Sequence, residues 1–148
     1  MREIRIETDK LFTCLTKTVE EQLQGFTGLA HIYTPHATAR LAALEDELLH
    51  QLDIRLFLDA MAPKDRPAEG ASRNSKYFHD MISLRQDVPE DERKNGHSHI
   101  RTLFFESSLT IPCQDGKLLL GEWLDLFFVE LDPRRPRKVF LSKIPVTD

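Results

Sequence analysis

The dipeptide Asp115-Gly116 stands between two strand-like apolar runs, residues 109–114 and 117–120. An Asp-Gly pair in this setting is a strong signal for a tight turn that joins two antiparallel strands. Further strand-like runs cover residues 2–8, 11–15, 29–33, 122–131 and 139–144. The chain is therefore expected to have an α+β fold: a single compact domain over residues 1–148, mainly an antiparallel β-sheet or sandwich with a few helices.

Residues 45–61 carry apolar side chains at helical spacing, and Pro63 ends this segment. The stripe predicts an amphipathic helix and consists of Leu48, Leu49, Leu52, Leu56 and Met61. Residues 16–24 and 97–105 are expected to form two shorter helices, the second with an inner face of Ile100, Leu103 and Phe104. Residues 37–43 are compatible with either a strand or a helix.

Residues 64–92 form a long segment with few apolar anchors. Loops of this length in a compact domain are usually functional or disordered. Tyr77 and His79 stand in the middle of this loop, and they favour the functional interpretation.

The composition excludes several classes of protein. A net charge of -4 gives no basic excess for binding nucleic acid. The apolar runs are too short to cross a bilayer, and the charged N-terminus is unlike a signal or transit peptide, so a cytoplasmic location is expected. Cys14, Cys113 and Trp123 lie in apolar surroundings and are expected to be buried.

The six histidines differ in what their positions indicate. His31 lies within a strand, where a structural role is expected, and His50 lies on the long helix, where an exposed position is expected. His36 follows the end of a strand and His79 lies in the long loop, and sites are commonly built at such places. The chain contains neither an HExxH nor a CxxC motif, so the spacing alone does not indicate a zinc site.

His97 and His99 open the predicted helix over residues 97–105. Residues two apart on a helix point about 200° away from each other, so both cannot enter one pocket. His99 shares a face with Leu103 and is expected to point inward, whereas His97 is expected to be solvated or to support the site from outside.

Several segments resemble, in the right order, those of one protein family. Residues 107–123 have a serine before an apolar strand, a glycine turn and a Gly-x-Trp ending, and residues 34–39 read TPHATA. Glu45 matches a family glutamate, and further matches are Tyr77-x-His79, Asn95-x-x-x-His99, residues 129–134 and Arg137. Together these segments resemble the YjbQ family over nearly the whole chain. The sequence departs from the family pattern at Leu44, Glu106 and Leu124, and two of these changes remove an amide group.

The resemblance implies an antiparallel α+β fold and a homotrimer. It also implies a secondary thiamine-phosphate synthase activity, in which a pyrimidine diphosphate condenses with a thiazole phosphate and pyrophosphate is released. The partner of the chain would then be a small phosphorylated substrate, with neither nucleic acid nor membrane involved.

The site hypothesis places His36, His79 and His99 in one pocket, with Glu45 nearby. The three imidazoles would hold a divalent metal, zinc or magnesium, or without a metal they would hold phosphate directly. His36 and Glu45 are the candidate catalytic residues, with Glu45 orienting a histidine or acting as a base. The candidate substrate-binding and phosphate-binding residues are Thr38, Ser107, Arg134 and Arg137.

Two other functions use the same residues. The first is a metal-dependent hydrolase of a small phosphorylated substrate. The second is a non-enzymatic trimeric module that binds a phosphorylated metabolite. Loss of the two amide groups, at Leu44 and Leu124, favours these alternatives slightly.

Overall fold

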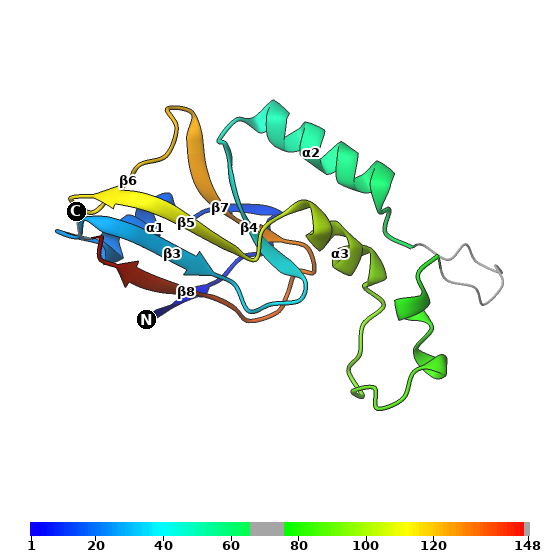
Figure 1. Cartoon of the computed structure of the whole chain (residues 1–148). Coiled ribbons are helices and arrows are strands. Elements are labelled where there is room, and N and C mark those ends of the chain that lie inside the picture. Colours follow the sequence, from blue (N-terminus) through cyan, green and yellow to red (C-terminus); the bar gives the residue numbers. More distant parts are fainter. Residues whose placement is uncertain (66–75, 147–148) are drawn as a thin grey trace.

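Two antiparallel sheets make up the framework in the computed structural model, which describes residues 1–65 and 76–146. The larger sheet has the strand order β1 (Arg2–Ile6), β8 (Arg137–Ile144), β3 (Gly28–Tyr33), β5 (Ser108–Gln114) and β6 (Lys117–Leu118). The smaller sheet has the order β2 (Phe12–Cys14), β7 (Leu124–Glu130) and β4 (Ala39–Glu45). The predicted α+β class with a mainly antiparallel sandwich is confirmed (Figure 1).

The main core lies between the sheets. Ile32 and Val139 of the larger sheet and Leu41, Leu126 and Phe128 of the smaller one are completely buried and belong to one hydrophobic cluster. Leu126 and Phe128 are two apart on β7, and side chains two apart on a strand share a face. Because β7 also contributes Val129 to a second cluster on its other face, it is buried on both sides.

The Asp115-Gly116 turn forms as predicted and joins β5 to β6. Both residues have a positive φ, 48° for Asp115 and 83° for Gly116, as a two-residue hairpin turn requires. Residues 37–43, which the sequence left open, fall largely in β4, a strand paired with β7 over its full length.

In the part of the chain that the structure describes, three α-helices accompany the sheets: α1 (Thr16–Gln22), α2 (Leu48–Met61) and α3 (Gly96–Arg101). Figure 1 shows α2 running beside the sandwich, outside both sheets. Glu47 caps α2, since its carboxylate accepts the backbone N–H groups of Leu49 and His50. Of the α2 side chains only Leu58 is fully buried.

The apolar stripe of α2 is mostly exposed. Leu48, Leu49, Leu52, Leu56 and Met61 all keep a large part of their surface open within this chain. Helical spacing therefore identified the helix correctly, but periodicity alone does not say what covers the stripe. The packing contact with the smaller sheet is made by Leu58 and by the half-buried Ile54.

The predicted inner face of the helix over residues 97–105 is wrong, because Ile100, Leu103 and Phe104 are exposed and His97 is buried. The segment forms α3 and then a 3-10 turn, η3 (Thr102–Phe104), so the apolar pattern does not stay on one face. Trp123 and Cys14 are also exposed, contrary to expectation, while Cys113 is buried.

The long loop before α3 contains two 3-10 turns, η1 (Phe78–Asp80) and η2 (Ile82–Leu84), and the part of the predicted loop at 66–75 lies outside the described residues. Tyr77 anchors the described part, since its hydroxyl donates to the backbone oxygen of Pro63 at 2.6 Å. Within the described ranges, no helix has the length and apolar character needed to cross a membrane.

Candidate functional site

A cavity of about 550 Å³ opens where the β3–β4 turn, the β7–β8 turn, η1 and the start of α3 meet. It brings together the three histidines that the sequence singled out, His36, His79 and His99. Its full lining is Pro35, His36, Ala37, Thr38, His79, Arg85, Glu92, Asn95, His99, Arg135, Pro136 and Arg137. Residues from three parts of the chain, 35–38, 79–99 and 135–137, therefore share one concave site.

His36 is fixed by a backbone hydrogen bond. Its Nε2 accepts the N–H of Lys138 at 2.9 Å, so in the neutral ring the proton is on Nδ1. Burial, and then the positive charge of Arg137, lower the pKa of His36. The neutral ring therefore has a donor on Nδ1, while its Nε2 is occupied.

His79 and His99 lie against each other, with ring centroids 4.4 Å apart and an angle of 32° between the rings. Nε2 of His79 is 3.6 Å from a carboxylate oxygen of Glu92. Burial, and then the neighbouring His79, lower the pKa of His99. The lowered pKa favours the neutral form of His99, whereas an anion that enters the cavity favours its protonated form.

Arg137 is buried in the wall and pairs with Glu130, with Nε to Oε2 and Nη2 to Oε1 both at 2.6 Å. Nη2 also donates to Thr38 Oγ1 and to the backbone oxygen of Asp132. The predicted phosphate clamp is thus largely a structural ion pair. Of the three guanidinium nitrogens of Arg137, Nε and Nη2 have these acceptors. Nη1 has no acceptor among the described residues, so it is available to a ligand.

Asp132 organises the donors beside the cavity. One of its oxygens accepts Asn95 Nδ2 at 2.9 Å and Arg135 Nε at 3.1 Å, and the other accepts Arg93 Nη1 at 3.0 Å. Burial alone would raise the pKa of Asp132, but the Asn95 hydrogen bond and the charges of Arg93 and Arg135 lower it. Two guanidinium groups share this one carboxylate, so the cluster keeps a positive charge that favours an anion.

Three predicted site residues do not line the cavity. Glu45 lies at the far end of β4, paired with Leu124, about 20 Å of strand from the end near Thr38. Ser107 and Arg134 are exposed and lie outside the cavity lining. Within one chain, Glu45 therefore does not accompany the histidines, and Arg135 lines the cavity where Arg134 was expected.

The sequence also missed Arg85, Glu92 and Arg135. Arg85 and Glu92 pair at 2.7 Å across the loop before α3, where the sequence shows no periodicity. Arg135 belongs to the basic turn that the sequence did identify, but the choice between neighbours depends on the backbone. Arg134 has a φ of 70°, and this left-handed turn leaves it exposed while Arg135 lines the cavity.

The geometry does not suit a metal ion. In residues 1–65 and 76–146, no group of three or more histidine, cysteine, aspartate or glutamate side chains is placed to hold one. Nε2 of His36 is already occupied by the N–H of Lys138, so this ring has only Nδ1 left for a ligand. The same groups suit an anion, which accepts hydrogen bonds from several directions.

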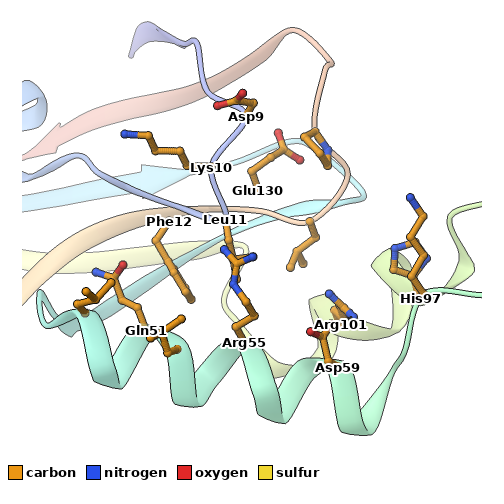
Figure 2. A pocket seen from close by; sticks show the side chains of 15 residues that line it. Asp9, Lys10, Leu11, Phe12, Gln51, Arg55, Asp59, His97, Arg101 and Glu130 are labelled. Atoms are coloured by element: carbon orange, nitrogen blue, oxygen red, sulfur yellow. Dashed lines mark hydrogen bonds and ion pairs between the residues drawn. The ribbon is translucent and has the colours of Figure 1, made fainter.

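A second cavity, of about 650 Å³, lies between α2 and the residues before β2. Figure 2 shows Gln51, Arg55 and Asp59 of α2 on one side of this space, with His97 at one end. The two neighbouring histidines of α3 thus line different cavities, as helical geometry requires. His97 was expected to be solvated or supporting, but only 8% of its surface is exposed.

Burial, and then the charges of Arg101 and Lys64, lower the pKa of His97. The unfolded chain binds a proton on this ring near pH 6.5, where the folded chain does not, so stability should fall as the pH drops below about 6.5. We expect His97→Asn to make the free energy of unfolding depend less steeply on pH between 7 and 5. Urea unfolding at several pH values measures this, and equal slopes in the two proteins would contradict it.

Comparison with known proteins gives consistent matches. A family model described as "UPF0047 protein YjbQ-like" matches residues 2–145. A UPF0047 protein from Archaeoglobus fulgidus is 28% identical over 130 residues, 88% of each chain, and UPF0047 protein YugU of Bacillus subtilis is 24% identical over 96% of this chain and 97% of its own. The solved structure of a hypothetical protein from Aeropyrum pernix superposes with a TM-score of 0.75 at 29% identity, covering 97% of this chain and 96% of that one. A conserved hypothetical protein from Thermus thermophilus gives 0.73 at 25% identity, covering 97% and 100%.

Proposed function

This chain belongs to the UPF0047 family of YjbQ-like proteins, and we propose that it is a cytoplasmic enzyme that acts on small phosphorylated substrates in the cavity of His36, His79 and His99. One observation carries the proposal. Three imidazoles from distant segments line a single concave site together with Arg135 and Arg137. Such a set of donors is suited to phosphate oxygens.

The proposed reaction is of the thiamine-phosphate synthase type. A nitrogen of the thiazole phosphate attacks the carbon that carries the diphosphate of the pyrimidine, and a carbon–nitrogen bond forms. The carbon–oxygen bond to the diphosphate breaks, and pyrophosphate leaves with the electron pair. Because negative charge grows on the leaving oxygen, donors fixed in advance around it lower the barrier most.

Each residue of the cavity has a role in this scheme. Arg135 and Arg137 Nη1 donate to the diphosphate, and His36 donates through Nδ1. His99 takes up a proton when the anion is bound, which adds positive charge. Glu92, near His79 Nε2, orients the histidine pair, the role that the sequence suggested for Glu45.

A bound zinc or magnesium ion is not used in this scheme, because the side chains as placed do not converge on one point. The metal-dependent hydrolase remains the rival that requires such an ion. Elemental analysis of the purified protein separates the two. A divalent metal bound one per chain would favour the hydrolase, whereas protein without metal that still binds pyrophosphate favours the proposal.

The second rival is a binding module without turnover. The missing amides at Leu44 and Leu124, which the sequence took as slightly favouring it, lie at the end of the β4–β7 pair away from the cavity, so within one chain they do not decide between the two. Incubation with a pyrimidine diphosphate and a thiazole phosphate distinguishes the two. Release of pyrophosphate together with the condensed product supports the synthase, and binding without product supports the module.

We also propose that the chain assembles as a homotrimer, with α2 in the interface. The exposed Leu48, Leu49, Leu56 and Met61 support this, since monomeric proteins rarely leave such a run of apolar side chains on one helix open to water. The expected mass in solution is three times the 17.1 kDa of one chain. Light scattering after size exclusion measures it, and Leu56→Lys should shift the mass toward the monomer. A wild-type monomer at micromolar concentration would contradict the proposal.

Binding of phosphate groups in the cavity is tested by removing one guanidinium group. Arg135→Met should weaken pyrophosphate binding by roughly ten- to a hundredfold, since a hydrogen bond to a charged group contributes about 1.5–3 kcal/mol. Isothermal titration calorimetry measures the dissociation constant. The matched control is Arg134→Met, the same substitution at the exposed neighbour outside the cavity, which should stay within about twofold of wild type. Equal effects of the two substitutions, or no binding by the wild type, would reject the proposed site.

A further inference from the structure

The cavity wall contains a buried acceptor without a partner. Asn95 lines the cavity and is 6% exposed, and its Oδ1 makes no hydrogen bond to any described residue. Its Nδ2 donates to Asp132 Oδ2 at 2.9 Å, which fixes the orientation of the amide. Turning the amide over would place two oxygens against each other, so Oδ1 is the free group.

A buried acceptor in this state is unfavourable, because it has lost water without gaining another donor. Native proteins keep few such groups, and those that remain often belong to functional sites. Asn95 is held in place from two sides, since Asp132 binds its side chain and its backbone oxygen accepts the N–H of Ser98 at 2.8 Å. A donor that reaches Oδ1 can satisfy it while Nδ2 keeps its hydrogen bond to Asp132.

The free acceptor lies next to a positive charge. Asn95 Nδ2 and Arg135 Nε donate to the same oxygen of Asp132, at 2.9 Å and 3.1 Å. The distance between the two nitrogens is therefore no greater than the sum of these two hydrogen-bond lengths. A ligand whose phosphate contacts Arg135 has its neighbouring atoms close to Asn95.

We propose that Asn95 Oδ1 selects phosphorylated ligands that carry a hydrogen-bond donor, a hydroxyl or an amine, close to the phosphate. This inference rests on the proposed function, because it takes the cavity to be a phosphate site. The proposal narrows the class of substrates. A plain alkyl phosphate leaves Asn95 Oδ1 unsatisfied, whereas a hydroxylated phosphate ester donates a hydrogen bond to it.

The test compares two probes of nearly equal size, 2-hydroxyethyl phosphate and propyl phosphate. Calorimetry on the full chain should give about tenfold tighter binding of the hydroxylated ester, a ratio that corresponds to one satisfied buried acceptor. In Asn95→Ala the ratio should fall to about one. Asp132→Asn is the control, since its one remaining oxygen can accept Asn95 Nδ2 while the charge and the acceptor for Arg93 are lost, so it should preserve the ratio while changing both affinities together.

The outcomes separate the two claims. If neither ester binds the wild type, the phosphate site itself is wrong. If both bind equally well, the phosphate site stands and the role of Asn95 is wrong, as it also is if the preference survives in Asn95→Ala. Should Asn95→Ala fail to fold, Asn95→Ser replaces it, and the wild-type ratio already decides whether the acceptor selects a donor.

Discussion

Arg137→Met is expected to destabilise the protein by about 3–5 kcal/mol, because it leaves Glu130 as a buried charge without its partner. The side chains of both residues are almost inaccessible, at 3% for Arg137 and 0% for Glu130. The substitution also removes the hydrogen bonds that Arg137 donates to Thr38 Oγ1 and to the backbone oxygen of Asp132. These two bonds join the β3–β4 turn to the β7–β8 turn. Urea unfolding followed by circular dichroism measures the loss.

Two further variants show that the ion pair is the cause. Arg134→Met makes the same change at an exposed position three residues earlier and should cost less than about 0.5 kcal/mol. Pairing Arg137→Met with Glu130→Leu should recover most of the lost stability, because no buried charge is then left alone. A loss below about 1 kcal/mol for Arg137→Met alone would show that water reaches Glu130 and that the pair is not buried in solution.

Gly96→Ala is expected to cost about 1–3 kcal/mol and to weaken pyrophosphate binding at least tenfold. A Cβ on Gly96 would lie 2.5 Å from Cβ and 2.9 Å from Cγ of Tyr77, and 3.1 Å from Oδ1 of Asp80. Tyr77 is tied to Pro63 through its hydroxyl, so it has little room to move. The start of α3 and η1 must therefore separate.

That separation acts on the site because the two elements carry His99 and His79, whose rings are in contact. Unfolding and pyrophosphate titration of the same variant measure both effects. Gly121→Ala is the control, since its nearest neighbour is the end of the Leu124 side chain at 3.3 Å, and it should leave both quantities near the wild-type values. Wild-type stability and affinity in Gly96→Ala would mean that α3 and η1 are not held together as described.

The strands were predictable because their signals are local. Alternation and turn chemistry located the hairpin at Asp115-Gly116, and the positive φ values there follow from the residue types. The direction in which a helix faces is not local. Leu56 lies on the apolar stripe of α2 and Leu103 follows α3, and both side chains are exposed, because an apolar pattern in the sequence does not show which surface covers it.

The site was predictable only in part. His36, His79 and His99 have no spacing that indicates a cluster, and their meeting followed from the family resemblance. The sequence pointed to Arg134 instead of its neighbour Arg135. The left-handed backbone of Arg134 decides which of the two arginines lines the cavity. Asn95 was part of a recognised motif, but its unpartnered oxygen depends on Asp132, a residue brought in by the fold.

A crystal structure of the protein with pyrophosphate tests the central claim most directly, that distant imidazoles and guanidiniums form one anion site. The anion is expected in the cavity, within hydrogen-bonding distance of Arg135 and of Arg137 Nη1, with an imidazole of the His79–His99 pair beside it. Pyrophosphate bound elsewhere, or a cavity that holds only water at a saturating concentration of the anion, would contradict the account.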